Sequence, residues 1–328
     1  MTSESIRYSA AACQTDLPNP INRRQMRANT DRMLSMIDSA VAGSAPFLPV
    51  RLLVFPEFAH AAPVFATVGE LLDKLAVTIP NEHTDLIARK AAELGVYIQT
   101  GSMIECDDRW PGVAFNTTCL IGPKGILYKY RKVNPWIPFE VHASPHDLPG
   151  YDEPMFPVAD TEIGRIGCAI CYDWLFPEAI RQLAANGAEV LVRVSAYMAP
   201  WGATEPMNWW TIIHRARAIE NIAYVVAANQ GASLRHYPPY SWPGQRQLEL
   251  LFEQREHRVE THLRVCHRRR HVRHRQQQRD PRQRCELLGF AVGEEQLDDR
   301  RRLERELQGL RDQPRGPDCR RDVHLGAG

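Results

Sequence analysis

Apolar runs and amphipathic stretches alternate along the first 244 residues of this 328-residue chain. The run RLLVF at 51–55, which Pro56 ends, is typical of a strand that is buried on both faces. Residues 22–42 carry apolar side chains at helical spacing and predict an amphipathic helix. The same criteria predict further strands at 7–15, 96–104, 115–121, 125–133, 165–171, 190–194 and 224–228. They predict further helices at 84–94, from Pro177 to Gly187 and from Pro206 onward.

The order of these elements indicates the fold class. Turn residues at 122–125 separate two strand patterns and predict a hairpin, whereas helical patterns separate most of the other strands. The helix after Pro206 carries one apolar face, which consists of Ile212, Ala216, Ile219 and Ala223. Hairpins mixed with helical crossovers predict an α/β protein in which helices pack outside a sheet.

The composition changes abruptly after Gly244. Residues 245–328 contain 20 Arg and no Lys, Ile, Met, Trp, Tyr, Ser or Asn. Only 23 of these 84 residues are hydrophobic, which is too few to offset the entropy of ordering the segment. The sequence therefore predicts a folded domain at 1–244 and a separate Arg/Gln/His-rich tail at 245–328.

Three interpretations of this tail are open. The first is a disordered or loosely helical extension, and the second is a basic arm that binds nucleic acid. The third is the out-of-frame translation of a GC-rich gene. The missing residue types have AT-rich codons and the change is abrupt, so a frame change is favoured. Fifteen acidic residues among the arginines argue against nucleic-acid binding. The leucine repeat at 297–310 is too short to predict a coiled coil.

The net charge of the chain is +1, which argues against general binding to nucleic acid or membranes. No apolar run approaches the ~18 residues of a membrane span. The first residues lack the basic and then apolar pattern of a secretory signal, so a cytoplasmic location is expected. Eight cysteines are ordinary usage for this length, and no disulfide framework is expected.

Two segments place charged side chains at the ends of predicted strands. Glu57, in VFPEF, directly follows a buried strand and serves either acid–base chemistry or a capping or surface role. In KYRK, strand alternation places Arg131 and Lys132 on opposite faces. A sheet that is covered on both faces must bury at least one cation, and a buried lysine can stabilise an oxyanion. The alternative is an edge strand whose cations reach water.

The third segment, GCAICYDWLFPE, places Cys171 between a strand and the helix that Pro177 begins. A tight turn at this point exposes a nucleophile and leaves backbone N–H groups free for an oxyanion. Glu57 is a candidate base for the thiol, and a buried structural cysteine is the alternative.

Metal and redox sites are disfavoured. Cys168 and Cys171 form a CxxC pattern, but residues three apart on a strand face opposite ways. His142 and His146 have a metal-like spacing without partner cysteines. The remaining histidines with suggestive spacing lie in the tail at His267, His271 and His274.

Taken together, Glu57 in PEF, Lys132 in KYRK and Cys171 in ICYDWLFPE resemble the Glu–Lys–Cys triad of the nitrilase superfamily of carbon–nitrogen hydrolases. KYRKVNPWIPFE is most similar to the aliphatic amidase and formamidase branch, which places that branch's second glutamate at Glu140. The resemblance runs from about residue 8 to about residue 243 and includes the segments 188–198 and 218–231.

The resemblance implies a mechanism for these residues. Glu57 takes the thiol proton, Cys171 attacks an amide carbonyl, and water hydrolyses the resulting thioester. Lys132 and the backbone N–H of Tyr172 hold the oxyanion, and Glu140 orients substrate or water.

The resemblance also implies a four-layer α-β-β-α sandwich that forms homodimers or larger homo-oligomers and needs no metal or organic cofactor. Residues 1–244 are then a carbon–nitrogen hydrolase domain whose C-terminal strands the tail replaces. Loss of those strands exposes unpaired edges and apolar surface, so we expect this chain to be poorly stable, aggregation-prone or inactive.

The residues after the nucleophile bear on the substrate. Nitrilases proper usually have Cys-Trp-Glu, whereas this chain has Cys-Tyr-Asp at 171–173, which favours a small carboxamide over a nitrile. An N-carbamoyl substrate is an alternative, with Arg193 as a candidate partner for its carboxylate. An inactive or regulatory relative that acts through its Arg-rich tail is another. Five aromatic residues line a pocket or pack as core and rim: Trp136, Tyr172, Trp174, Tyr197 and Trp201.

Overall fold

The computed structural model describes residues 6–15, 18–136, 140–197, 208–230 and 262–267. The chain divides into one unit at Met1–Arg270 and a second at His271–Gly328. The second unit lies outside the described residues, and so do the expected boundary at Gly244 and the leucine repeat of the tail.

The first unit contains two β-sheets. The larger sheet has the strand order β10-β1-β2-β3-β4-β5, and the smaller has the order β6-β7-β8-β9. The strands of the larger sheet are β1 (Ile6–Ala12), β2 (Val50–Val54), β3 (Tyr97–Cys106), β4 (Ala114–Gly122), β5 (Gly125–Arg131) and β10 (His262–His267). Those of the smaller sheet are β6 (Val158–Thr161), β7 (Gly164–Ile170), β8 (Val190–Ser195) and β9 (Tyr224–Asn229).

Parallel pairing joins β1, β2 and β3 in the larger sheet and β7, β8 and β9 in the smaller one. The hairpin that the turn residues predict is present, because β4 and β5 pair antiparallel through Gly122 and Gly125. Strands that run parallel need crossover connections, and helices provide most of them. Their carboxyl ends share one edge of each sheet, which is where the candidate residues lie.

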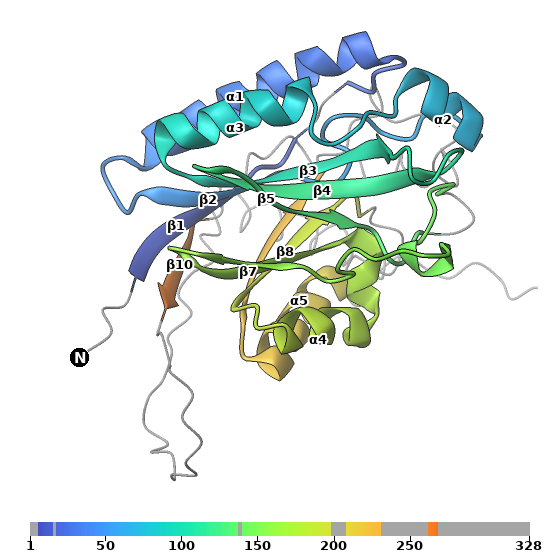
Figure 1. Cartoon of the computed structure of the whole chain (residues 1–328). Helices are drawn as coiled ribbons and strands as arrows, with labels where there is room; N and C mark the ends of the chain where they lie inside the picture. Colours follow the sequence, from blue (N-terminus) through green and yellow to red (C-terminus); the bar gives the residue numbers. More distant parts are fainter. Residues whose placement is uncertain (1–5, 16–17, 137–139, 198–207, 231–261, 268–328) are drawn as a thin grey trace, which may run out of the picture. The chain divides into compact units, whose positions relative to one another are not determined.

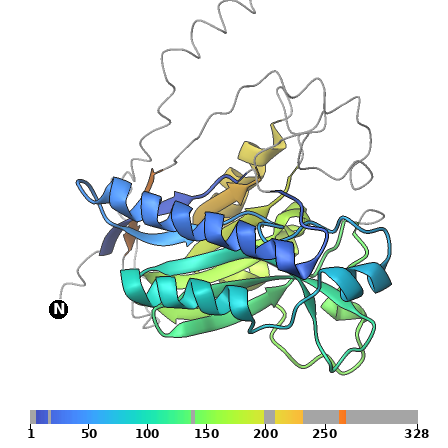
Figure 2. The same ribbon diagram turned by 90° about the horizontal axis from the view of Figure 1, so that it is seen from above.

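The helices form the two outer layers. Figure 1 shows α1 (Arg23–Ser44) and α3 (Glu82–Leu94) on the outer side of the larger sheet. On the outer side of the smaller sheet lie α4 (Pro177–Ala185) and α5 (Trp209–Asn221). Seen from above, α1 and α3 run side by side (Figure 2). The expected four-layer α-β-β-α sandwich is therefore confirmed.

Local signals in the sequence set the helix ends. The side chain of Asn81 accepts hydrogen bonds from the start of α3 in a capping box, and Gly95 ends this helix with φ 64°. Asn22 caps α1, and Pro177 occupies the first turn of α4. Each of these helices then presents apolar side chains to a sheet.

The core between the sheets consists of buried side chains from both. Leu52 and Val54 of β2 pack in one cluster with Ile166, Ile170 and Val192 of the smaller sheet. A second cluster joins α1 and α3 to the outer face of the larger sheet. Burial on both faces explains why the strand patterns are continuous apolar runs.

The apolar pattern on α5 does not correspond to a buried face. Ile212 is 56% exposed and Ile219 is 77% exposed, whereas the buried side chain of the helix is Arg217. Apolar periodicity identifies a face that can be buried but not the surface that buries it.

None of the helices in the described part of the chain is long and apolar enough to cross a membrane.

One α-helix and two strands of the described residues lie outside the patterns identified above. One is the short helix α2 (Val68–Lys74), and another is the edge strand β6. The third is β10, which belongs to the tail and pairs antiparallel with β1 from Ile6 to Ala11. Among the described strands, β10 therefore covers the edge at β1, while β9 has β8 as its single neighbour. The expectation of open edges thus does not apply to β1.

Candidate active site

Glu57 lies just beyond β2 and is 1% exposed. Its Oε1 accepts hydrogen bonds from Lys132 Nζ and Asn116 Nδ2, both at 2.8 Å. Its Oε2 accepts one from the backbone N–H of Ala196 at 2.9 Å. These donors come from three separate chain segments, so Glu57 is a fixed, buried carboxylate and not a surface or capping residue.

Lys132 directly follows β5 and is 2% exposed. Besides Glu57, its ammonium contacts both carboxylate oxygens of Glu140, at 2.8 and 2.7 Å. Burial alone would lower the pKa of Lys132, but Glu140 and Glu57 raise that pKa above its ordinary value. The lysine therefore remains a cation between two carboxyl groups.

Glu140 belongs to the same cluster, as the resemblance implies. It accepts hydrogen bonds from the backbone N–H of Trp136 and from Asn116 Nδ2. Burial raises the pKa of Glu140, whereas Lys132 and His142 lower it, and the net shift is downward. Glu140 is thus an ionised carboxylate that helps to hold Lys132 in place.

Cys171 follows β7 at a sharp turn. Its φ of 46° lies in the left-handed region, and the 3₁₀-helix η2 begins at Cys171 and ends at Leu175. Asp173 fixes this turn because its Oδ2 accepts hydrogen bonds from the backbone N–H of Ile170 at 2.9 Å and from Tyr130 at 2.7 Å. Burial raises the pKa of Asp173 to about 6.

The thiol of Cys171 is protonated at neutral pH. Burial and the carboxylate of Glu57 raise the pKa of Cys171 to about 12, although Lys132 and Arg193 act to lower it. A thiol in this state reacts with a carbonyl only if a base removes its proton. The fixed carboxylate of Glu57 is the base that this arrangement offers.

The sequence patterns alone do not point to two residues of this site, and they suggest another role for a third. Asn116 bridges Glu57 and Glu140, and Asp173 holds the turn at the nucleophile. Arg193, considered above only as a partner for a substrate carboxylate, donates from Nη2 to the main-chain oxygen of Cys171 at 3.3 Å. The sequence carries one signal for these three residues. Each is a polar or charged side chain within a buried strand or within three residues of its end.

Arg131 and Lys132, the last two residues of KYRK, are both buried, but they belong to different clusters of charged side chains. Arg131 donates to both carboxylate oxygens of Glu105 at 2.8 and 2.7 Å and to Asp107 at 2.6 Å. Lys129 and Glu153 extend this second cluster. Arg131 therefore lies in an ion-pair network that shares none of these residues with the candidate triad.

Four of the five aromatic residues lie in the described part, and Trp201 lies outside it. Trp174 is fully buried in the core, where its indole N–H donates to the main-chain oxygen of Ala169 at 3.1 Å. Of the two roles expected for Trp174, lining of a pocket or packing in the core, its burial matches packing in the core. Trp136 supports Glu140 through backbone hydrogen bonds in both directions.

Tyr172 and Tyr197 are both half-buried. The ring of Tyr172 packs edge-on against Phe176 at 5.2 Å. The backbone of Tyr197 is fixed by two hydrogen bonds with the side chain of Asn229, at 2.7 and 2.9 Å. A substrate-binding role for these two tyrosines stays a prediction.

Candidate metal ligands are not brought together. His142 is buried and His146 is exposed, and the described residues contain no group of three or more potential ligands arranged for a metal ion. Cys168 and Cys171 are both free thiols. Cys168 is fully buried inside β7, and burial raises its pKa, as is typical of a structural cysteine.

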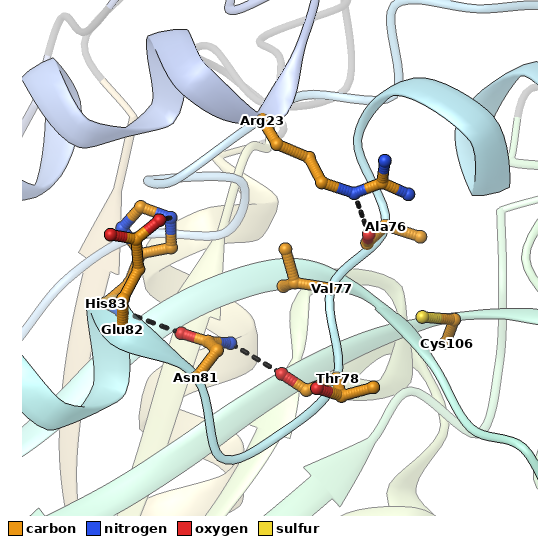
Figure 3. A pocket seen from close by; sticks show the side chains of 8 residues that line it. All are labelled: Arg23, Ala76, Val77, Thr78, Asn81, Glu82, His83 and Cys106. Atoms are coloured by element: carbon orange, nitrogen blue, oxygen red, sulfur yellow. Dashed lines mark hydrogen bonds and ion pairs between the residues drawn. The ribbon is translucent and has the colours of Figure 1, made fainter.

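A cavity of about 480 Å³ lies in another part of the unit and contains none of the triad residues. Figure 3 shows Arg23 reaching across it from α1 to the main-chain oxygen of Ala76. Asn81 and His83 line it at the start of α3, where Asn81 caps the helix. These contacts stabilise the ends of α2 and α3, and no hydrogen bond joins the thiol of Cys106, which also lines the cavity, to His83 or Glu82.

Comparison with known proteins gives the following matches. A family model described as carbon-nitrogen hydrolase matches residues 9–255. A formamidase of Bacillus cereus and one of Bacillus anthracis are each 31% identical over 213 residues, which is 64% of this chain and 59% of those proteins. The chain thus spans less than two thirds of the length of these curated relatives.

Solved structures resemble the fold. Saccharomyces cerevisiae Nit3, a member of branch 10 of the nitrilase superfamily, has a TM-score of 0.57 at 22% identity, covering 70% of this chain and 78% of Nit3. A mutant of the amidase from Nesterenkonia sp. AN1, in complex with butyramide, has a TM-score of 0.53 at 20% identity, covering 70% and 77%.

Proposed function

Because this chain belongs to the carbon–nitrogen hydrolase family, we propose that it hydrolyses a small carboxamide to a carboxylic acid and ammonia. The observation that carries the proposal is the buried Glu57–Lys132–Glu140 cluster beside Cys171 at a left-handed turn. The described site residues lie between Glu57 and Gln230.

The proposed reaction begins with the protonated thiol. Glu57 removes the proton as the sulfur of Cys171 attacks the amide carbonyl, which forms a C–S bond and a tetrahedral oxyanion. Lys132 and the backbone N–H of Tyr172 stabilise that oxyanion. Collapse breaks the C–N bond, and Glu57 donates the proton to the departing ammonia.

The resulting thioester is then hydrolysed by water. Glu57 takes a proton from the attacking water and returns it to the thiolate of Cys171 as the acid leaves. Glu140 keeps Lys132 in position and orients the water or substrate. The chemistry uses only side chains, and the proposal includes no metal or organic cofactor.

An amide is favoured over the alternatives. The curated relatives are formamidases and one structural neighbour binds butyramide, which supports short neutral amides as substrates. An N-carbamoyl compound is the second candidate, because Arg193 is a buried cation near Cys171. A nitrile and a regulatory role of the tail have weaker support.

The test is ammonia release by the full chain from formamide, acetamide and butyramide, with N-carbamoylglycine and propionitrile in parallel. We expect turnover of at least one short amide, and Cys171→Ala should reduce it by about 10³-fold or more. Cys168→Ala, a matched change in the adjacent buried thiol, should retain turnover. Carbon dioxide release from N-carbamoylglycine would instead favour the carbamoyl substrate, and activity that persists in Cys171→Ala would overturn the mechanism.

We also propose that the chain forms homo-oligomers through its outer helices. Ile212 and Ile219 of α5 and the adjacent Ile222, which is 85% exposed, present apolar surface. Light scattering during size-exclusion chromatography should give a multiple of the chain mass of 37.4 kDa. A monomer at micromolar concentration would contradict this proposal.

A further inference from the structure

Arg193 is a buried cation in the middle of β8, next to the nucleophile. It is fully buried, and the strand register places it opposite Ala169 of β7, two residues before Cys171. Its Nη2 donates to the main-chain oxygen of Cys171 at 3.3 Å. A charged side chain in a strand interior is costly to bury, so its position requires an explanation.

The surroundings of Arg193 fix its direction without neutralising its charge. Its Nη1 donates to Nε2 of His214 at 3.0 Å, and its guanidinium carbon lies 4.5 Å from the ring centre of Trp210. Burial and Arg193 lower the pKa of His214 to about 2, so the imidazole is neutral and accepts the hydrogen bond. Within the described residues, Arg193 forms no ion pair with a carboxylate.

Arg217 provides an internal comparison. It also donates to main-chain oxygens of the turn after the nucleophile, at 3.1 Å for Trp174 and 3.4 Å for Leu175. In contrast to Arg193, it is paired with a carboxylate, that of Glu220, at 3.1 Å. The two arginines thus anchor the same turn, but only Arg193 contacts Cys171 itself.

We propose that Arg193 is a positioning residue for the nucleophile: it holds the main-chain oxygen of Cys171 and keeps a positive charge beside the thiol. This inference rests on the proposed function of Cys171. The hydrogen bond maintains the left-handed turn, and the charge favours the thiolate that forms during attack. The other ionisable groups that interact with the thiol are Glu57 after β2, Lys132 after β5 and Tyr197 after β8.

The test compares Arg193→Gln and Arg193→Lys with the matched control Arg217→Gln in the full chain. The thiolate is titrated with methyl methanethiosulfonate, which transfers its methylthio group to the sulfur and releases methanesulfinate. Modified Cys171 is quantified by peptide mass spectrometry between pH 6 and 10, so other free cysteines do not interfere. The same variants are assayed for kcat and KM with the amide that is turned over fastest.

In Arg193→Gln we expect the rate of modification between pH 6 and 10 to fall about tenfold at each pH, because the pKa of the Cys171 thiol rises by about one unit. We expect kcat to fall about 10- to 100-fold while KM changes less than about threefold. Arg193→Lys keeps the charge and should restore the rate of thiol modification more than it restores kcat. Arg217→Gln should leave the modification profile of Cys171 unchanged.

Three results would overturn the inference. They are identical modification profiles for Arg193→Gln and Arg217→Gln, an unchanged kcat, or a rise in KM alone, which would make Arg193 a substrate contact. If Arg193→Gln does not fold, the comparison of Arg193→Lys with the parent chain decides. If the parent chain hydrolyses no amide but Arg193 still controls thiol modification, the proposed function fails and this inference stands.

Discussion

Lys132 and Arg131 are adjacent in the chain, and each lies at the centre of a buried cluster of carboxylates. Around Arg131, the cations of Arg109, Lys129 and Arg131 contact the carboxylates of Glu105, Asp107 and Glu153, and Arg109 also reaches the exposed carboxylate of Asp152. Around Lys132, one ammonium is shared by Glu57 and Glu140. Both clusters bury charge and lie near a thiol, but Cys119 beside the first is fully buried within β4, whereas Cys171 beside the second is partly exposed at a turn.

The difference shows which feature distinguishes a site from a structural ion network. The guanidinium of Arg131 is fixed by its carboxylate partners and also by Phe115, whose ring centre lies 4.1 Å away. Each buried carboxylate of this cluster has a cationic partner, and the hydrogen bonds between Arg131 and Glu105 are bidentate, so the cluster has no group left to react. The Lys132 cluster combines an excess of carboxylate with a protonated thiol, which is the arrangement that proton transfer requires.

The largest effect is expected from Lys132→Gln. This change removes the cation that would stabilise the oxyanion and leaves Glu57 and Glu140 as two like charges in one buried site. We expect kcat for amide hydrolysis to fall by about 10³-fold or more. Ammonia release by the folded variant measures it, and a variant that retains a tenth of the parent activity would remove Lys132 from the mechanism.

The matched change in the other cluster of buried charges is Arg131→Gln. It removes the buried guanidinium that Glu105 and Asp107 share and leaves Lys129 as their common cation. Removal of one member of a buried ion pair costs about 3–5 kcal/mol of unfolding free energy. Urea denaturation measures this loss. The fraction that remains folded should keep kcat within about threefold of the parent chain, since Arg131 contacts no triad residue. A large fall in kcat at unchanged stability would show that the two clusters are not independent.

The sequence carries enough local information for most of the fold. Apolar runs and turn residues mark the strands and the hairpin between β4 and β5, and caps mark the helices. The short edge strand β6 has four residues and little periodicity. The strand β10 is hidden because the composition of the whole tail is polar, although HLRVCH itself alternates. The outward face of α5 depends on which surface covers it, and no local pattern encodes that.

The site is predictable only where it lies at strand ends. Glu57, Lys132 and Cys171 are identified because reactive side chains there follow apolar runs, and their combination resembles a known triad. Asn116 lies 59 residues from Glu57, and Ala196 lies 139 residues from it. Such contacts depend on strand order and register, so spacing along the chain does not reveal them.

A lower pH should have a smaller effect on stability, and this effect arises in the Arg131 cluster. Hydrogen bonds from Arg109 and then Arg131 lower the pKa of Asp107 well below its ordinary value, against the effect of burial. This carboxylate therefore adds stability above its ordinary pKa, and the contribution is lost as the pH falls toward its folded pKa. Between pH 6 and pH 3, we expect Arg131→Gln to lose less stability than the parent chain, by less than about 1 kcal/mol, because Arg109 still lowers the pKa of Asp107.

Urea midpoints at several pH values measure this difference. Burial raises the pKa of Asp173, which gives the opposite sign: its contribution is lost as the pH rises through about 6. That residue is unchanged in both proteins, so its effect cancels in the comparison. Parallel pH profiles for the two proteins would show that the Arg131 cluster does not cause the acid sensitivity.

The smallest effect is expected from Arg109→Gln, at the outer end of the Arg131 cluster. Arg109 donates to Asp107 at 3.0 and 2.7 Å and also to Glu153, but its side chain is 48% exposed. Water and salt screen such a pair, so its removal should cost less than about 1 kcal/mol, and less still at high salt. The loss in Arg131→Gln should change little with salt because its pairs are buried. Equal losses in both variants at low and high salt would mean that exposure does not govern the strength of this network.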